Sequence, residues 1–327
     1  MESTNHLSVC ALKGLLSDFL AQKRALGYKY NEQEHSLKRF IDFVGTRNPQ
    51  GQCMLPKELV LEYCGRRASE TPKTQSNRIS DLRQFIAYLN TNGFETYMPK
   101  LPRKQQSKYL PYVFTHEQMS SIIAAADALE WHNRYNCAEV YPVLFRVLYG
   151  CGLRISEALN LRVHDVKLNE CTLVIRKSKF DKSRLVVMDD SLLCIISGFL
   201  DEYCKLYDEN DYLFKHRDGA KRSSKAVYEC FRELLWKCGI PFQGRGIGPR
   251  LHDVRHTFCC HSLKKMSDAG IDMYCALPVL SAYVGHSGIS STERYLRLTE
   301  EFYPDVRGRV QMSASQVYPE VYMDESD

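Results

Sequence analysis

The chain has 327 residues, 44% of them hydrophobic, and a net charge of +5. This hydrophobic content is enough for a core and excludes wholesale disorder, while the absence of any run near about 18 apolar residues excludes a transmembrane helix. The mild positive charge permits nucleic-acid binding but does not by itself indicate it. The 13 cysteines form no C-x-x-C pair, which is typical of reduced thiols in a cytoplasmic protein with no membrane partner.

Residues 7–98 show apolar side chains at helical spacing in four segments. Four helices in about 90 residues make one small domain, so we predict an all-helical domain over residues 1–98. The third segment follows Pro56, which suits a first helical turn, and the fourth stops at Gly93. The apolar positions are Leu12, Leu15, Leu16, Phe19 and Leu20, then Leu37, Phe40, Ile41 and Val44, then residues 59–63, and finally Ile79, Leu82, Phe85, Ile86 and Leu89.

A basic, proline-containing stretch follows, and we assign residues 99–113 to an interdomain linker. Prolines and like charges favour an extended conformation. The stretch is either a solvated spacer or a segment that follows a phosphate backbone, and the sequence leaves both readings open. Its candidate DNA-binding side chains are Lys100, Arg103, Lys104 and Lys108.

Residues 114–305 are predicted to form a mixed, mostly helical domain. An apolar helix over residues 139–149 ends at Gly150, and a second helix over residues 152–159 carries Arg154 and Glu157. Two β-branched runs, residues 172–176 and 184–188, are joined by the lysine-rich KSKFDKS and indicate a β-hairpin. Amphipathic helices are predicted over residues 192–206 and 226–238.

The last segment is a C-terminal tail over residues 306–327. From Gln311 onward it contains acidic residues but no Lys or Arg, a composition that favours a disordered end. A cluster of apolar and aromatic side chains within it could instead dock on a neighbouring protomer. These side chains are Val317, Tyr318, Val321 and Tyr322.

Residues 251–298 contain several side chains that are suited to catalysis. His252 and Arg255 are three residues apart, so they share one face of a helix. His286 follows a helix that ends at Gly285. Tyr295 comes nine residues later, on a short helix predicted from the capping-box spacing just before it.

These residue types fit attack of a phenol on a phosphodiester. The pKa of a free tyrosine is about 10, so Tyr295 would need a base, such as His252, and a positive environment. The guanidinium forks of Arg154 and Arg255 match the charge that develops on the phosphate oxygens. His286 could donate to a phosphate oxygen, and a lysine of the hairpin could protonate the leaving alkoxide.

Less specific readings exist for the same residues. Arg154 could simply pair with Glu157. His252 and His256 could bind zinc with the nearby Cys259, Cys260 and His261, but ligand pairs at finger spacing are missing. No carboxylate pair is placed for two-metal hydrolysis, so we expect no metal and no cofactor.

The order and spacing of GLRISEALNL, a lysine-bearing hairpin, HDVRHTF and VGHSGISSTERY resemble the tyrosine recombinase (phage integrase) family over about residues 114–300. The N-terminal region and the linker resemble the family's SAM-like core-binding domain more weakly. The hairpin connection offers two candidates for the general acid, and we assign Lys179, the more central one, with Lys177 as the alternative. Lys177 follows the strand residue Arg176, so we assign it to contact with a DNA phosphate. The complete catalytic set that the resemblance implies is Arg154, Lys179, His252, Arg255, His286 and Tyr295.

The resemblance implies a mainly α fold with a small β-sheet that closes as a C-shaped clamp on duplex DNA. It further implies a 3′-phosphotyrosine intermediate, a free 5′-hydroxyl and strand exchange through a Holliday junction. The expected assembly is a homo-tetramer on two DNA sites with inverted-repeat core sequences, in a prokaryotic, nucleoid-associated setting, for integration or excision of a mobile element. The alternatives are a type IB topoisomerase and a catalytically silent DNA-binding protein on the same scaffold.

Overall fold

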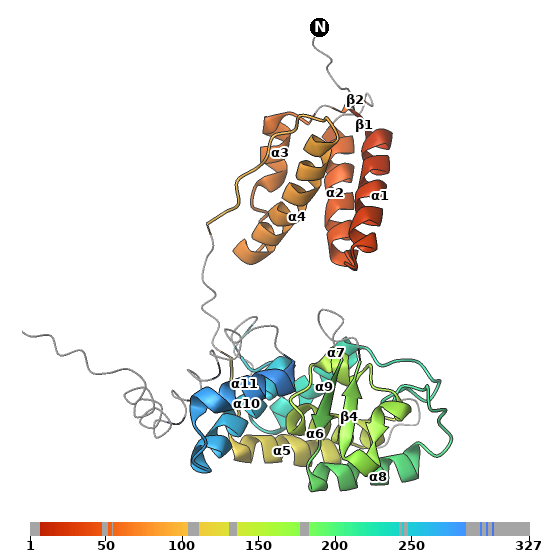
Figure 1. The fold of residues 1–327 in the computed structure, drawn as a ribbon, viewed down its shortest axis with the longest axis vertical. Helices are drawn as coiled ribbons and strands as arrows, with labels where there is room; N and C mark the ends of the chain where they lie inside the picture. Colours follow the sequence, from red (N-terminus) through yellow and green to blue (C-terminus); the bar gives the residue numbers. More distant parts are fainter. Residues whose placement is uncertain are drawn as a thin grey trace, which may run out of the picture. The chain divides into compact units, whose positions relative to one another are not determined.

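The computed structural model divides the chain into two compact units, Met1–Lys108 and Tyr109–Asp327 (Figure 1). The structure describes residues 7–47, 52–53, 55–103, 111–130, 136–176, 183–241, 244, 248–285, 295, 299 and 303. Several predicted features lie outside the described residues. They are Lys104, Lys108, Lys177, Lys179, His286 and the tail over residues 306–327.

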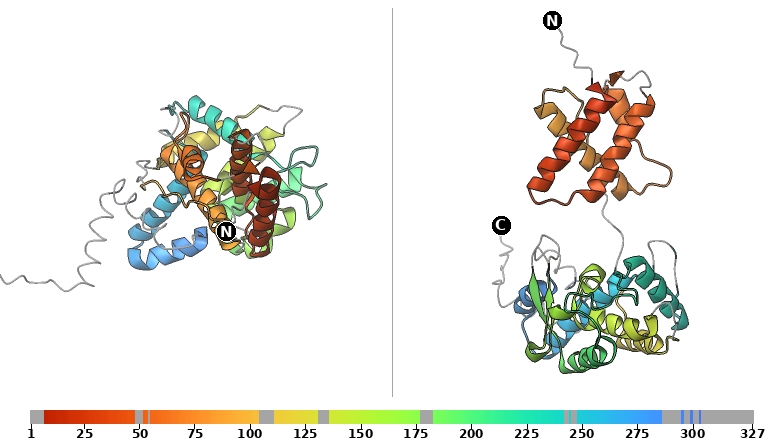
Figure 2. Two further views of the ribbon diagram at one scale, coloured as in Figure 1. Left: turned by 90° about the horizontal axis from the view of Figure 1, so that it is seen from above. Right: turned by 90° about the vertical axis from the view of Figure 1, so that its right-hand side faces the viewer.

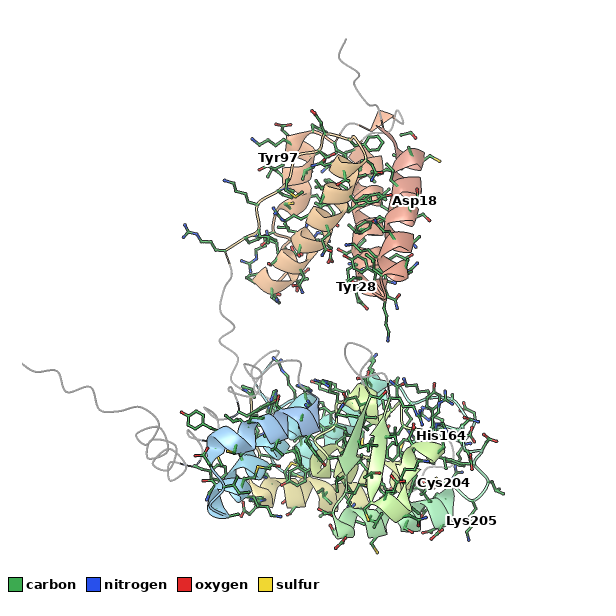
Figure 3. The ribbon with its side chains drawn as sticks, viewed as in Figure 1. Asp18, Tyr28, Tyr97, His164, Cys204 and Lys205 are labelled. Atoms are coloured by element: carbon green, nitrogen blue, oxygen red, sulfur yellow. The ribbon has the colours of Figure 1, made fainter. Side chains whose placement is uncertain are left out.

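The first unit contains the four predicted helices, α1 (Val9–Ala25), α2 (Asn31–Arg47), α3 (Lys57–Cys64) and α4 (Pro72–Thr91). The hydroxyls of Ser8 and Thr71 accept hydrogen bonds from backbone N–H groups at the starts of α1 and α4, where helical donors lack partners. Most of the apolar positions that predicted the helices form one buried core, whereas Leu61 is exposed. Tyr97, labelled in Figure 3, follows α4 and lies under the Lys57 ammonium, which is 5.3 Å from its ring centroid.

The prediction that this unit is all-helical is wrong in one detail. A two-residue strand, β1 (Leu7–Ser8), pairs antiparallel with β2 (Gln52–Cys53). Strands this short contain no alternation of apolar and polar residues, so their pairing leaves no periodic signal in the sequence.

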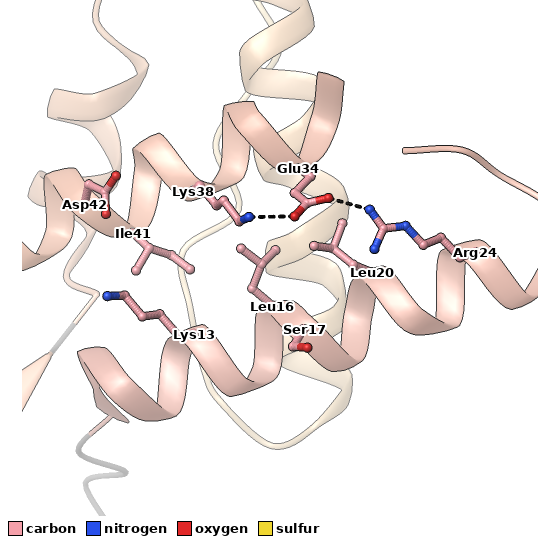
Figure 4. Close-up of a pocket in the computed structure, with 9 residues that line it drawn as sticks. All are labelled: Lys13, Leu16, Ser17, Leu20, Arg24, Glu34, Lys38, Ile41 and Asp42. Carbon is pink, nitrogen blue, oxygen red and sulfur yellow. Dashed lines mark hydrogen bonds and ion pairs between the residues drawn. The ribbon is translucent and has the colours of Figure 1, made fainter. Parts of the chain in front are cut away.

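An ion pair buried in the first unit joins α4 to the loop after α3. Arg78 and Glu70 are joined by two hydrogen bonds of 2.8 and 2.6 Å, and their side chains are 7% and 5% exposed. Arg78 also donates to the carbonyl oxygens of Tyr63 and Gly65. Two further ion pairs share Glu34, which accepts from Arg24 and from Lys38 in a surface pocket between α1 and α2 (Figure 4).

The second unit contains helices α5 (His116–Asp127), α6 (Cys137–Gly150), α7 (Ile155–Ala158) and α8 (Asp190–Tyr203). They are followed by α9 (Ser224–Lys237), α10 (Leu251–Asp268) and α11 (Met273–Val284). Short 3-10 helices span Val163–Asp165 and Leu168–Glu170. No helix among the described residues is long and apolar enough to cross a membrane.

The small sheet of this unit has the strand order β3–β4–β5 and is antiparallel (Figures 1 and 2). Its strands are β3 (Val166–Lys167), β4 (Thr172–Ile175) and β5 (Arg184–Val187). The predicted hairpin is therefore confirmed, whereas the two-residue β3 was not predicted. The mainly helical fold with a small sheet is also confirmed.

Helix α10 is central to the second unit, because buried side chains occur on nearly all of its faces. It packs against α6 and α11. Apolar residues fill the space between these helices, and they include Val254, Cys259, Cys260, Leu263 and Leu280. Residues of α10 therefore hold fixed positions relative to the ends of neighbouring elements.

One buried polar contact also joins α6 to α10. The Tyr149 hydroxyl lies 2.7 Å from Nδ1 of His261, and the His261 ring stacks on His116 with centroids 3.9 Å apart. Burial and the nearby His116 lower the pKa of His261 to about 4, so its imidazole is neutral near pH 7.

We expect Arg78→Met to destabilise the first unit by about 3–5 kcal/mol, because it leaves the buried Glu70 carboxylate without its charge partner. Hydrogen exchange of α3 and α4 in the full chain measures the effect. The matched control is Arg24→Met, which removes an arginine from the partly exposed pair with Glu34 and should change stability by about 0–1 kcal/mol. Equal effects of the two substitutions would contradict this assignment.

We expect His261 to make the second unit less stable in acid. Its pKa is lower in the folded chain than in the unfolded chain, so the unfolded chain binds more protons between about pH 6.5 and 4. Lowering the pH from 7 to about 5 should therefore cost about 2 kcal/mol through this residue. Urea unfolding at both pH values measures it, and His261→Gln should remove that part of the difference. A pH dependence that is unchanged in His261→Gln would refute the prediction.

Candidate active site

Arg154 lies at the start of α7, where the chain passes close to α10. Gly152 has φ +58°, and a Cβ atom there would lie 2.2 Å from Cδ1 of Phe258 on α10. Only glycine fits this conformation at so short a distance. The close approach brings Arg154 next to the residues of α10.

Arg255 projects from α10 and is 2% exposed. One Nη donates to the Gly152 carbonyl at 2.7 Å, and the other donates to the Val284 carbonyl at 2.6 Å. This side chain thus connects α10, the loop before α7 and the C-terminal end of α11.

Three arginines bind successive carbonyl oxygens at the end of α11. Arg184 Nε donates to Tyr283 at 2.8 Å, Arg255 donates to Val284, and Arg154 Nη2 donates to Gly285 at 3.3 Å. The last carbonyls of a helix lack helical partners and carry partial negative charge, so guanidinium groups stabilise them.

Glu157 lies among the same three guanidinium groups. Its carboxylate accepts from Arg154 at 2.7 Å and from Arg184 at 3.0 and 3.1 Å, and it lies 3.8 Å from Arg255. Burial alone would raise the pKa of Glu157, but hydrogen bonds from Arg184 and Arg154 lower it to about 2. Three cations thus surround one anion, and the cluster keeps an excess of positive charge.

The less specific interpretation of Arg154 was that it only pairs with Glu157, and the structure does contain this ion pair. Arginine offers five N–H donors, and the side-chain hydrogen bonds of Arg154 to Glu157 and Gly285 use two of them. The ion pair and contact with a phosphate are therefore compatible. Sequence reasoning missed Arg184, whose position at the start of a strand gave no signal of this role.

His252 lies one turn before Arg255 on α10. Its ring meets the His256 ring edge to face, with centroids 4.9 Å apart. Desolvation by the surrounding protein and the Arg255 and Arg154 cations lower the pKa of His252 to about 4, although the residue is exposed and solvent opposes this shift. The imidazole is therefore neutral near pH 7 and able to accept a proton.

Tyr295 is helical, as predicted, and is 3% exposed. Its ring centroid lies 5.3 Å from that of His256, and its hydroxyl is near enough to the side chains of Arg255 and Cys259 to interact electrostatically with both. Burial and Cys259 raise the pKa of the phenol, and Arg255 opposes this rise. The phenol is therefore protonated in this arrangement.

The structure brings together four of the predicted catalytic residues. They are Arg154, His252, Arg255 and Tyr295. Of the predicted DNA-binding residues, Lys100 and Arg103 are exposed on the first unit. Among the described residues, no group of three potential ligands could hold a metal ion, so the zinc alternative has no ligand set there.

The known proteins to which this chain is similar are integrases and recombinases. The phage integrase family model matches residues 112–301. The protein y4rB of Sinorhizobium fredii, named as an integrase or recombinase, is 29% identical over 306 residues, which cover 90% of this chain and 96% of y4rB. The tyrosine recombinase XerA of Pyrococcus horikoshii is 28% identical over 216 residues, which cover 65% of this chain and 66% of XerA.

The fold is also similar to that of a solved recombinase. The structure of the XerH site-specific recombinase bound to its difH substrate, a pre-cleavage complex, has a TM-score of 0.63 at 18% identity. The match covers 95% of this chain and 85% of XerH. The family model spans more than half of the sequence and confirms the resemblance drawn from the motifs, so the chain belongs to the phage integrase family.

Proposed function

We propose that this site-specific DNA recombinase cuts each strand through Tyr295, with Arg154 and Arg255 bound to the scissile phosphate. The observation that carries the proposal is the contact of the Tyr295 hydroxyl with Arg255 inside a cluster of guanidinium groups. A nucleophile beside preorganised donors is the arrangement that phosphoryl transfer requires.

The proposed step is a transesterification. The Tyr295 oxygen forms a bond to phosphorus as the bond from phosphorus to the 5′-oxygen breaks, and His252 accepts the phenol proton. Lys179 protonates the departing 5′-oxygen, and His286 donates to a phosphate oxygen. A 5′-hydroxyl from another strand then reverses the step, so the phosphotyrosine bond is exchanged without an external energy source.

The burial of Tyr295 sets a condition on this step. At 3% exposure the phenol does not face a DNA backbone, and its raised pKa disfavours the reactive phenolate. We infer that the hydroxyl leaves Cys259 and becomes exposed when the DNA phosphate binds beside it. His252 then receives the proton, because its imidazole is neutral at neutral pH and has a free acceptor nitrogen.

We extend the proposal to the partners. XerH is bound to a difH substrate in its structure, and we propose an inverted-repeat core site in duplex DNA as the substrate of this chain. The proposed assembly is a homo-tetramer on two sites, in which the two units clamp the duplex with the linker residues along its backbone. Accessory proteins stay an open part of this proposal.

Two features support recombination over the alternative functions. The relatives and the structure described above are named as integrases or recombinases, which disfavours a relaxing topoisomerase. Arg154, His252, Arg255 and Tyr295 are all present and adjacent, which disfavours a catalytically silent protein. Integration or excision of a mobile element is the proposed biological setting.

We expect Tyr295→Phe to bind DNA as the wild type does but to form no covalent complex, because only the nucleophilic hydroxyl is lost. The substrate is a duplex selected by binding from a randomised library, and the complex is detected on denaturing gels. The control is Tyr149→Phe, which removes a half-buried hydroxyl of the same unit and should leave the complex intact. A covalent band from Tyr295→Phe would exclude this residue as the nucleophile.

We expect Arg154→Lys to slow cleavage of the same duplex by about 100- to 1,000-fold, since an ammonium cannot bridge Glu157, the Gly285 carbonyl and a phosphate as a planar fork does. Single-turnover cleavage rates measure the effect, and thermal unfolding confirms that the variant is folded. A folded variant with a rate near that of the wild type would show that Arg154 does not contact the phosphate in the transition state.

A further inference from the structure

Arg184 and Arg154 bind the same carboxylate in different ways. The two Nη atoms of Arg184 donate to the two oxygens of Glu157, at 3.1 and 3.0 Å. The guanidinium group of Arg154 donates to Oε1 of Glu157 at 2.7 Å, and the Arg154 backbone N–H donates to Oε2 at 2.9 Å. An arginine fork that holds both oxygens of a carboxylate is the stronger and more directional pairing. Arg184 forms this fork with Glu157.

The Arg184 side chain is also fixed by its other neighbours. Its Nε donates to the Tyr283 carbonyl at 2.8 Å. Gly285 has φ +69°, and a Cβ atom at this position would lie 2.8 Å from Arg184 Nη1, so the guanidinium group packs directly against the end of α11. The side chain of Arg184 is 11% exposed, and that of Arg154 is 22% exposed. Of these two arginines, Arg154 is thus the more accessible one.

Glu157 is too well buried to stay ionised without cations close to it. Its side chain is 5% exposed. Burial acts to raise the pKa of Glu157, and hydrogen bonds, of which that from Arg184 has the largest effect, lower it to about 2. The pair of Arg184 and Glu157 has no net charge, so the remaining two positive charges of the cluster, on Arg154 and Arg255, are not offset by it.

Loss of Arg184 would change this balance. The cations left beside Glu157 would be Arg154 and Arg255, whose Nη1 atoms lie 2.7 and 3.8 Å from its oxygens. A buried carboxylate that loses its charge partner is strongly unfavourable, so Glu157 would draw the nearer guanidinium group into the vacant fork. Arg154 would then have less charge and fewer donors to offer another anion.

We propose that Arg184 is a positioning residue that neutralises Glu157 and thereby leaves the guanidinium group of Arg154 available to the scissile phosphate. The inference rests on the proposed function, because it takes Arg154 as a ligand of that phosphate. Arg184 itself contacts neither the phosphate nor Tyr295 in this role. Its effect on cleavage therefore depends on the negative charge of Glu157.

The test combines Arg184→Met with Glu157→Gln and measures single-turnover cleavage of the selected duplex. Arg184→Met should slow cleavage by about 100-fold, because Glu157 then withdraws one donor from the developing charge. Glutamine has the shape of glutamate and can still accept from the Arg154 backbone N–H, but it carries no charge. Adding Glu157→Gln should therefore accelerate the Arg184→Met variant by about 10-fold or more, although it changes a second member of the cluster.

Arg146 on α6 offers a matched control. Its two Nη atoms bind the two oxygens of Asp127 at 2.6 and 2.7 Å, which is the same forked pairing in the same unit. The Asp127 side chain is 47% exposed, so solvent weakens the pair. Arg146→Met, alone or combined with Asp127→Asn, should cleave within about 5-fold of the wild-type rate. Thermal unfolding checks that each variant is folded.

A purely supporting role of Arg184 predicts a different result. If Arg184 only holds the cluster together, Glu157→Gln should slow the Arg184→Met variant further or leave its rate unchanged, and either outcome overturns the inference. Glu157→Gln in the otherwise wild-type chain completes the cycle. Acceleration by the same factor with and without Arg184 refutes the inference, since Glu157 would then act independently of Arg184. A wild-type rate in a folded Arg184→Met variant refutes it as well.

Should Arg184→Met fail to fold, Arg184→Lys decides the question, since lysine keeps the charge but cannot form the fork. The inference requires that Glu157→Gln accelerates Arg184→Lys more than it accelerates the wild type. Equal factors in the two backgrounds refute it.

Failure of the proposed function gives a separate pattern. If the wild type forms no covalent complex, if Tyr295→Phe does form one, or if folded Arg154→Lys cleaves at the wild-type rate, the proposed function is wrong. If all three behave as proposed and only the acceleration of the Arg184 variants by Glu157→Gln is missing, the positioning role alone is wrong.

Discussion

The arrangement of the second unit depends on one charge cluster, in which Glu157 lies among Arg154, Arg184 and Arg255. Like charges repel strongly where water is scarce, so three guanidinium groups stay together only with compensating negative charge. Glu157 supplies one full charge, and the carbonyl groups at the end of α11 supply partial charges. The chain must pass close to α10 at Gly152 to permit this convergence.

Two titratable groups beside the cluster have pKa values that are shifted in opposite directions. Desolvation and positive neighbours lower the pKa of His252, while burial and Cys259 raise the pKa of Tyr295. A neutral imidazole and a protonated phenol are thus both present near pH 7. Pairs of groups whose environments shift their pKa values apart are typical of acid and base roles. The excess positive charge of the cluster is the feature that suits it to a phosphodiester.

Much of this could be predicted from the sequence, because helices with apolar faces and a β-branched hairpin leave periodic patterns. His252 and Arg255 were placed together by their spacing on one helix. Three parts could not be predicted. The carbonyl oxygens of residues 283–285 are main-chain atoms, which every residue has, so no side-chain pattern marks them as ligands. Arg184 appeared only as a strand residue, and β1, β2 and β3 have two residues each, too few for alternation.

The contacts of Arg255 suggest how substrate binding and release of the nucleophile are linked. Its guanidinium group binds the Val284 carbonyl, at the beginning of the segment that leads to Tyr295, and it also interacts electrostatically with the Tyr295 hydroxyl. One side chain therefore influences both ends of that segment. In the proposed mechanism a phosphate competes with the hydroxyl for donors of the same guanidinium group, whereas the bond to Val284 can persist. Binding of DNA would then free the phenol while its attachment to α11 stays fixed, so the nucleophile becomes available only where a phosphate is already bound.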